Sequence, residues 1–321
     1  MSQPTTYQDG SLLAEIEALA VEIARGGGAI LGRYFGSTLE IEYKDENKTD
    51  PVTVADKESQ TYLAGAISER FPDHGIVGEE DEDETEERAA APDFVWVLDP
   101  LDGTKNFLNG MPVYACSIGV LHRGEPVAGA IYLPWPGEAA GVVAHARKGG
   151  GAFVDGEPAH MPDAAEPVGN RLVALPGSFG AAFRFSKPMH GKVGELRNTG
   201  SIAYDMAMVA RGVLQYSLTG SPRLWDVAGG AALVKEAGGV VMVGRRTGGR
   251  NPLMPPRLHW GTLESFISGW DSGTVTLKDL RRWSAPMVAG SPGIVRYVAA
   301  NVVPRSSLRR RLSRALRGRG A

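Results

Sequence analysis

The sequence predicts an α/β (α+β) protein in which helices cover β-sheets, and three observations favour this class. Two helical segments open the chain and are followed by apolar, strand-like segments separated by turn residues. In the second half, helical and strand-like segments alternate. The 321 residues are 43% hydrophobic, which is enough for a large core in one or two domains.

The first half is expected to be a layered antiparallel sheet faced by helices. Leucine, isoleucine and alanine recur at helical spacing over residues 11–35, although Gly26-Gly27-Gly28 weakens this pattern locally. A polar loop follows at 45–50, and a second helix is expected from about Asp56 to Arg70. After an acidic run at 79–87, strands are expected at 94–98, 113–121, 127–133 and 141–146.

The second half is expected to be a mixed sheet covered by helices. Strands are predicted at 172–175, 213–218 and 240–243, and helices at 201–211, 226–237 and 292–299. Residues 244–260, rich in glycine, proline and arginine, are interpreted as a loop. A Pro- and Ala-rich stretch predicts a division into an N-terminal half (1–165), a C-terminal half (166–304) and a basic tail (305–321).

The segment from Trp96 to Phe107, WVLDPLDGTKNF, carries the clearest chemical signal in the chain. Its first residues are typical of a buried strand, so Asp99 and Asp102 are expected at the strand exit. Mg²⁺ prefers oxygen ligands and commonly shares them with a substrate phosphate. The glycine that follows at 103 lets the backbone approach an anion closely. The segment therefore predicts metal-assisted phosphoryl-transfer chemistry.

Acidic residues also occupy the ends of three other predicted elements. Asp56 and Asp226 each begin a helix, and Gly78-Glu79-Glu80 follows a short Ile-Val strand. Each acid alone has an ordinary explanation, because an aspartate at a helix start is commonly an N-cap and a glutamate in an acidic run is commonly solvated. Four separate segments that place acids at element ends favour a common site instead.

These motifs resemble the inositol monophosphatase family of lithium-sensitive, Mg²⁺-dependent phosphatases. The resemblance rests on Asp56, Gly78-Glu79-Glu80, Asp99-Pro-Leu-Asp-Gly-Thr104 and Trp225-Asp226, with Asn106-Phe107 and Glu236-Ala-Gly-Gly239 beside them, and extends from about residue 11 to about 300. It implies a five-layer α-β-α-β-α sandwich, commonly a homodimer. The implied activity is a Mg²⁺-dependent phosphomonoesterase acting on a small phosphorylated metabolite similar to inositol monophosphate.

The resemblance also implies a role for each matched residue. Two or three Mg²⁺ ions would be bound by Glu79, Asp99, the Leu101 carbonyl, Asp102 and Asp226. Thr104, Glu79 and Asp56 would be catalytic, with Thr104 positioning the attacking water and Asp56 orienting the Thr104 hydroxyl. Substrate or phosphate would contact Asp102, Gly103, Thr104, Gly200, Ser201, Thr219 and Asp226. Lys44 lies close to the position of a family lysine near the metals, and a functional role for it stays open.

One position departs from the family pattern. Family members that act on inositol phosphate usually carry a glutamate seven residues before the last metal-binding aspartate, and this chain has Thr219 there. A lost carboxylate–hydroxyl contact changes selectivity strongly. Alternatives to an inositol phosphate are therefore a 3′(2′),5′-bisphosphate nucleotide, another sugar phosphate or histidinol phosphate. Arg223 is a candidate for contacting a second anionic group, with an ordinary surface arginine as the alternative.

Composition narrows the classes of protein function that the chain can have. Seven of the 34 basic residues lie in 305–321, so the rest of the chain is acidic and lacks a general nucleic-acid-binding character. The six histidines show no zinc-ligand spacing. A single cysteine, Cys116, is expected in the core and fits a reducing cytoplasm, and no signal region or membrane-spanning run is expected.

The basic C-terminal tail, residues 305–321, has a candidate binding role of its own. Leu308, Leu312 and Leu316 recur among arginines as in a basic amphipathic helix, which suggests contact with anionic lipid or RNA. A disordered or surface-docked tail is the favoured interpretation.

A non-catalytic regulatory protein on the same fold should have lost metal ligands, and because all of them are present the enzyme interpretation is preferred.

Overall fold

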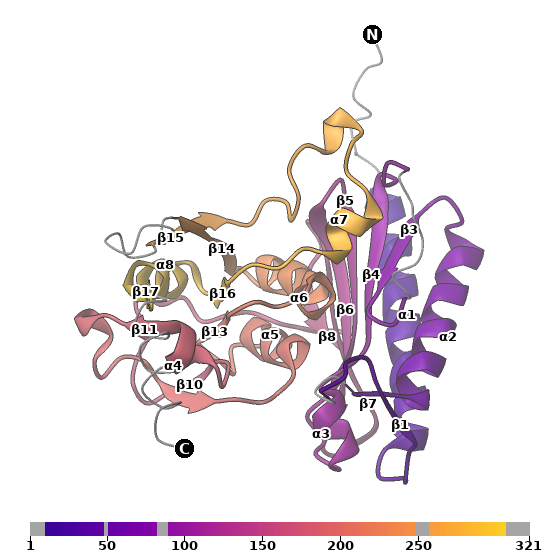
Figure 1. The fold of residues 1–321 in the computed structure, drawn as a ribbon, viewed down its shortest axis with the longest axis horizontal. Coiled ribbons are helices and arrows are strands. Elements are labelled where there is room, and N and C mark those ends of the chain that lie inside the picture. The colour runs from indigo at the N-terminus through magenta and orange to yellow at the C-terminus, as the bar shows by residue number, and fades with distance from the viewer. Residues whose placement is uncertain (1–9, 48–50, 82–88, 248–256, 306–321) are drawn as a thin grey trace.

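The computed structural model describes residues 10–47, 51–81, 89–247 and 257–305. It has a mixed α/β fold, as the sequence predicts (Figure 1). The helices are α1 (Gly10–Tyr34), α2 (Val54–Arg70), α3 (Thr104–Leu108), α4 (Phe179–Ala182), α5 (Ile202–Ala210), α6 (Leu224–Glu236), α7 (Leu277–Arg281) and α8 (Pro292–Asn301). None of the helices in these described ranges is both long enough and apolar enough to cross a bilayer.

A seven-stranded sheet is formed by the first half of the chain. Its order is β3-β4-β5-β6-β7-β8-β9. The strands are β3 (Gly75–Gly78), β4 (Phe94–Asp102), β5 (Ala115–His122), β6 (Glu125–Trp135), β7 (Glu138–Arg147), β8 (Gly151–Val154) and β9 (Glu157–Pro158). The prediction of a purely antiparallel sheet is wrong at one edge, because β3 pairs with β4 in parallel. This pairing sets Gly78 beside Leu98, so both strands end close together.

A six-stranded sheet belongs to the second half, in the order β12-β10-β13-β16-β14-β15. Its strands are β10 (Leu172–Ala174), β12 (Glu195–Arg197), β13 (Tyr216–Thr219), β14 (Val240–Thr247), β15 (Arg257–Thr262) and β16 (Met287–Gly290). Two further pairs complete the fold, β1 (Ile41–Tyr43) with β2 (Pro51–Thr53), and β11 (Phe183–Phe185) with β17 (Val302–Pro304).

The prediction of a loop over 244–260 is wrong at both of its ends. Residues up to Thr247 continue β14, and β15 begins at Arg257 and pairs with it in antiparallel register. The sequence of the whole segment is typical of a loop because glycines and prolines cluster between the two strands. Residues 248–256 lie outside the described ranges.

Two helix layers cover the seven-stranded sheet. Helices α1 and α2 pack on one face, and α6 packs on the opposite face against β4, β5 and β6 (Figure 1). Helix α5 packs beside α6, which also contacts β14 and β16 of the second sheet. Helix α6 is therefore buried between the two sheets, with nearly its whole length excluded from solvent. Its first turn lies where β4 ends, which places Asp226 near Asp99 and Asp102.

The glycine run in α1 does not interrupt the helix. It lets the helix approach its neighbours closely: a Cβ on Gly28 would lie 2.3 Å from the Tyr132 ring, and one on Gly27 would lie 2.8 Å from the Cys116 sulfur. Cys116 is buried in β5, as predicted. The glycines thus weaken the local helical preference but permit the packing that holds α1 on the sheet.

This packing yields a stability prediction. Gly28→Ala should lower the free energy of unfolding by about 1–3 kcal/mol, because the added methyl overlaps the Tyr132 ring in a filled core. Gly32→Ala, in the same helix with open space at its Cβ position, should be neutral or raise stability by about 0.5–1 kcal/mol. Urea denaturation of both variants checks this, and equal effects in the two would contradict the packing argument.

Candidate active site

The carboxylates of the site lie at the ends of strands and in the first turns of helices. Asp99 and Asp102 are at the end of β4, and both are almost fully buried. Asp99 Oδ1 accepts a hydrogen bond of 3.2 Å from the Leu101 amide, so the short turn between the two aspartates is held by the first of them. Gly103 follows with φ of 95°, a left-handed conformation that favours glycine, and α3 begins directly after it.

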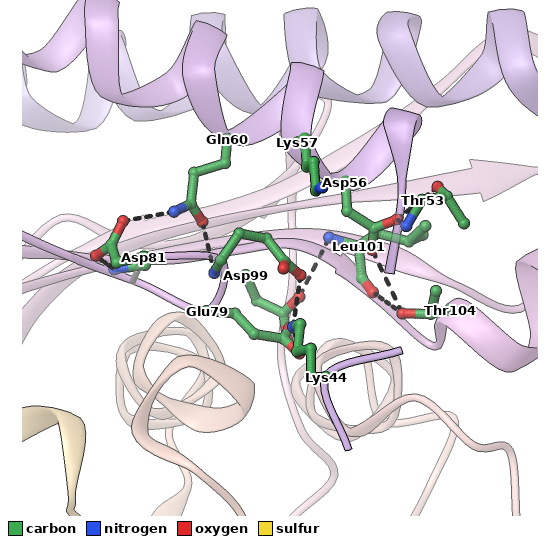
Figure 2. A network of polar contacts seen from close by, with 12 residues as sticks. Lys44, Thr53, Asp56, Lys57, Gln60, Glu79, Asp81, Asp99, Leu101 and Thr104 are labelled. Carbon is green, nitrogen blue, oxygen red and sulfur yellow. Dashed lines mark hydrogen bonds and ion pairs between the residues drawn. The ribbon is translucent and has the colours of Figure 1, made fainter. Parts of the chain in front are cut away.

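Asp56 and Asp226 have the same local setting in different halves of the chain. Each is the third residue of its helix, and each accepts a 2.8 Å hydrogen bond from the amide of the residue three positions earlier, Thr53 for Asp56 and Arg223 for Asp226. Neither aspartate is the N-cap itself, because Thr53 and Arg223 hold those positions, and each aspartate instead accepts from the N-cap amide as in a capping box. The second carboxylate oxygen of Asp56, Oδ1, lies 3.5 Å from the hydroxyl of Thr104 (Figure 2).

Thr104 joins the strand exit to α2. Its hydroxyl donates to the Leu101 carbonyl at 3.1 Å and lies 3.5 Å from Asp56. The structure therefore brings Asp56, Leu101 and Thr104 together, as the resemblance implies. These contacts place the threonine hydroxyl beside the turn that carries the two β4 aspartates.

Lys44 supplies positive charge to the acidic edge of the site. Its ammonium lies 3.0 Å from Glu79 Oε1 and 2.7 Å from Glu80 Oε1 (Figure 2). Although burial by itself lowers the pKa of Lys44, the two glutamates raise it above its ordinary value. The lysine therefore stays charged and offsets part of the repulsion between carboxylates. Sequence reasoning left its role open, and the structure shows this contact.

Burial and mutual repulsion shape the protonation of the site. Burial raises the pKa of Asp99 well above its usual range, and the charges of Glu79, Asp102 and Asp226 raise it further. Burial likewise raises the pKa of Asp102 to about 7, despite hydrogen bonds from Ser201 and Ala203, and the pKa of Asp226 well above its ordinary value. This much negative charge in a buried site favours a bound cation.

The donor set fits a hard divalent cation such as Mg²⁺. All of its members are oxygens, from four acidic side chains and one backbone carbonyl. They are not drawn around one point: among the described residues, no three His, Cys, Asp or Glu side chains meet at metal-binding distance. Asp102 instead accepts from the Ser201 hydroxyl at 2.8 Å and the Ala203 amide at 2.5 Å. Both hydrogen bonds are accepted by Asp102 Oδ2, and metal binding would require the carboxylates to move closer together.

A cavity of about 950 Å³ adjoins the carboxylates on the side of the second sheet. Gly200, Ser201, Thr219 and Asp226 line it, whereas Asp56, Glu79, Asp99, Leu101, Gly103 and Thr104 lie outside its lining. Gly200 has φ of 86° and lies against the Asn106 amide group, which donates to the Thr199 carbonyl at 2.7 Å. The turn before α5 is thereby tied to α3, beside the strand exit.

Two arginines of the cavity wall were missed by sequence reasoning. Arg245 and Arg246 are exposed on β14 and line the cavity, and the Arg246 guanidinium lies 5.5 Å from the centre of the Phe183 ring. Arg223, the residue considered for an anionic group, is exposed and lies outside the lining. Extending the predicted strand 240–243 as far as Arg245 and Arg246 would have identified both residues.

Comparison with known proteins agrees with this geometry. The profile of the inositol monophosphatase family matches residues 12–270. The chain belongs to the inositol monophosphatase family. This family is generally metal-dependent, and the curated relatives are phosphoric monoester hydrolases, so the chain is an enzyme of that class.

Individual relatives cover most of the chain. A protein of Aquifex aeolicus (strain VF5), named fructose-1,6-bisphosphatase/inositol-1-monophosphatase, is 33% identical over 233 residues, which are 71% of this chain and 83% of the relative. Inositol monophosphatase 3 of Solanum lycopersicum is 35% identical over 243 residues, 73% of this chain and 87% of the relative. The solved structure of a Thermotoga maritima IMPase superposes with a TM-score of 0.64 at 25% identity, covering 89% of this chain and 95% of that one.

The raised pKa values predict how the metal-free protein responds to pH. Burial is the main cause that raises the pKa of Asp56 to about 6 and of Glu80 to about 7. The folded chain therefore holds protons that the unfolded chain, with ordinary carboxyl pKa values near about 4, has already released. The contribution of these groups to stability should be fully present below about pH 4 and be lost as pH rises from about 4 to 7, by on the order of a few kcal/mol.

Urea denaturation of the chelated protein across this pH range measures the effect. Saturating Mg²⁺ should remove most of the pH dependence, since a cation stabilises the ionised carboxylates. Asp56→Asn, which cannot titrate, should show a smaller slope than the wild type. A metal-free stability that is flat or rises with pH would contradict this account.

Proposed function

We propose that this enzyme hydrolyses a small phosphorylated metabolite similar to inositol monophosphate with the help of two or three Mg²⁺ ions. The observation that supports this most directly is that acidic side chains from four segments lie at element ends beside a cavity large enough for such a substrate, with Asp99 close to the charges of Glu79, Asp102 and Asp226. When bound, the ions would neutralise phosphate charge and make water more acidic. Glu79, Asp99, the Leu101 carbonyl, Asp102 and Asp226 would hold them.

The protein's own groups would then position the reactants. Water attacks phosphorus, the bond from phosphorus to the ester oxygen breaks, and the departing oxygen takes up a proton as inorganic phosphate is released. The Thr104 hydroxyl, held between Asp56 and the Leu101 carbonyl, would hold the attacking water by hydrogen bonding. The Gly103 and Thr104 amides would contact the phosphate, and Gly200, Ser201 and Thr219 would contact the rest of the substrate.

The metal-ligand assignment predicts a loss of activity. Asp99→Asn and Asp226→Asn should each lower Mg²⁺-dependent phosphate release by more than about 100-fold, because each change removes a charged ligand. Asp271→Asn serves as the matched control, since this aspartate is exposed and its ion pair with Arg123 lies outside the site. Turnover near that of the wild type in either site variant would contradict the proposal.

A second candidate substrate class carries another anionic group. Arg245 and Arg246 line the cavity that Asp226 also lines, so one substrate could contact residues of both kinds. Thr219 carries a buried hydroxyl with no hydrogen-bond partner among the described side chains and backbone groups, which a polar substrate group would satisfy. The name of the Aquifex relative, which includes a bisphosphate substrate, also supports this class.

A substrate panel tests the arginine pair. Phosphate release from fructose 1,6-bisphosphate and adenosine 3′,5′-bisphosphate is compared with release from inositol 1-phosphate and histidinol phosphate. The double variant R245Q/R246Q should raise KM for the preferred bisphosphate about 10- to 100-fold and leave the monophosphates little changed, since charged hydrogen bonds contribute about 1.5–3 kcal/mol. R223Q is the control, and a bisphosphate preference that persists in the double variant would contradict the role of the pair.

Three further properties are proposed from sequence alone. The family resemblance supports a homodimer, and the single cysteine supports a cytoplasmic protein. The arginine-rich segment 305–321 supports contact with anionic lipid or RNA. Apart from Arg305, this segment lies outside the described residues. The division into halves at 165/166 likewise stays a prediction.

A further inference from the structure

Helix α7 lies at the edge of the seven-stranded sheet, beside the segment that carries Glu79. It follows residue 270, where the match to the family profile ends. Thr276 and Asp279 cap it reciprocally, with hydrogen bonds of 2.7 to 3.2 Å. The Val275 carbonyl accepts a 2.7 Å hydrogen bond from the Ala91 amide, and Leu280 is fully buried. Helix α7 is thus anchored against β3, as Figure 1 shows.

The last residue of α7, Arg281, holds the backbone of the Glu79 segment. One guanidinium nitrogen donates to the Gly78 carbonyl at 2.5 Å and lies 3.3 Å from a carboxylate oxygen of Asp81. The other donates to the Asp81 carbonyl, and to the Glu79 carbonyl at 3.4 Å. The side chain is only 19% exposed. A single planar group therefore serves three carbonyls, which an ammonium group cannot do with the same geometry.

The same segment is held from its other side by α2. Gln60 accepts from the Glu80 amide at 3.2 Å and donates to Asp81 Oδ1 at 2.5 Å (Figure 2). Asp81 Oδ2 accepts from the Gly78 amide at 2.6 Å, which closes the turn. Because α2 and α7 both hold this turn through its backbone, the position of Glu79 depends on both helices.

Arg281 also contacts the other half of the site. Its guanidinium carbon lies 5.6 Å from the centre of the Trp225 ring, within the range of cation–π attraction. Trp225 directly precedes Asp226 in the first turn of α6. One side chain thus connects the backbone around Glu79 with Trp225, the residue next to Asp226, and these two lie 146 positions apart in the sequence.

We propose that Arg281 is a positioning residue that sets the separation of Glu79 from Asp226, and thereby the affinity of the site for divalent cations. This inference rests on the proposed metal-dependent function. Residues that orient metal ligands without touching the metal typically change its affinity by about 10- to 100-fold when replaced. Arg281 acts in this way through the backbone of one ligand segment and through the neighbour of another ligand.

The test measures metal binding directly. Full-length protein is stripped with a chelator, and Mg²⁺ and Mn²⁺ are titrated by isothermal calorimetry. Arg281→Ala should weaken Kd about 10- to 100-fold. Arg281→Lys should also weaken it, since charge alone does not restore the three carbonyl contacts. Arg282→Ala, the exposed neighbour on the same chain segment, is the matched control and should bind as the wild type does. Urea denaturation of the metal-free variants separates affinity from stability.

The outcomes of this titration test the positioning role of Arg281 separately from the proposed function. A Kd for Arg281→Ala within about twofold of the wild type, with the protein folded, would overturn the positioning role, because a change in affinity of about tenfold or more is expected. If Arg281→Ala does not fold, Arg281→Lys and Trp225→Leu are titrated in its place, and unchanged affinity in both would overturn it. A wild-type protein that binds neither cation would instead contradict the proposed function.

Discussion

Repulsion between buried carboxylates is the constraint on which the rest of this structure depends. Burial raises the pKa values of Asp99, Asp102 and Asp226, and the charges of neighbouring carboxylates, Glu79 in each case, raise them further. The protein offsets part of this cost with backbone amides, the Ser201 hydroxyl and the Lys44 ammonium. A bound cation would offset the remaining repulsion, which agrees with the general metal dependence of the family.

Close helix–sheet packing is what brings these acids together. Helix α6 brings Asp226 to the end of β4 because glycines at the contact let the helix pack closely on the sheet. A Cβ on Gly129 would lie 2.4 Å from the Gly229 carbonyl, and one on Gly229 would lie 2.6 Å from the Ile118 carbonyl. Larger side chains would push α6 away and move Asp226 with it. The glycines of α1 act in the same way on the opposite face of the sheet.

Most of the fold followed from sequence pattern, and the exceptions have physical causes. Apolar periodicity predicted α1, whereas boundary residues predicted α2 and α6 and apolar runs predicted the central strands. The β14–β15 hairpin was missed because its strands are partly polar and separated by turn-forming residues. The parallel β3–β4 pair was missed because pairing direction depends on the path of the chain, which local composition does not encode.

The sequence by itself determined the family and the enzyme class, and it singled out the acidic residues proposed for the site, because those residues lie in short local motifs at element ends. Tertiary structure alone decided what surrounds them. Arg281 reaches Glu79 and the neighbour of Asp226 only because α7 is anchored on β3. Likewise, Arg245 and Arg246 line the cavity beside Asp226 only because β14 continues past its predicted end. Contacts between segments distant in sequence arise from packing, and no local pattern records them.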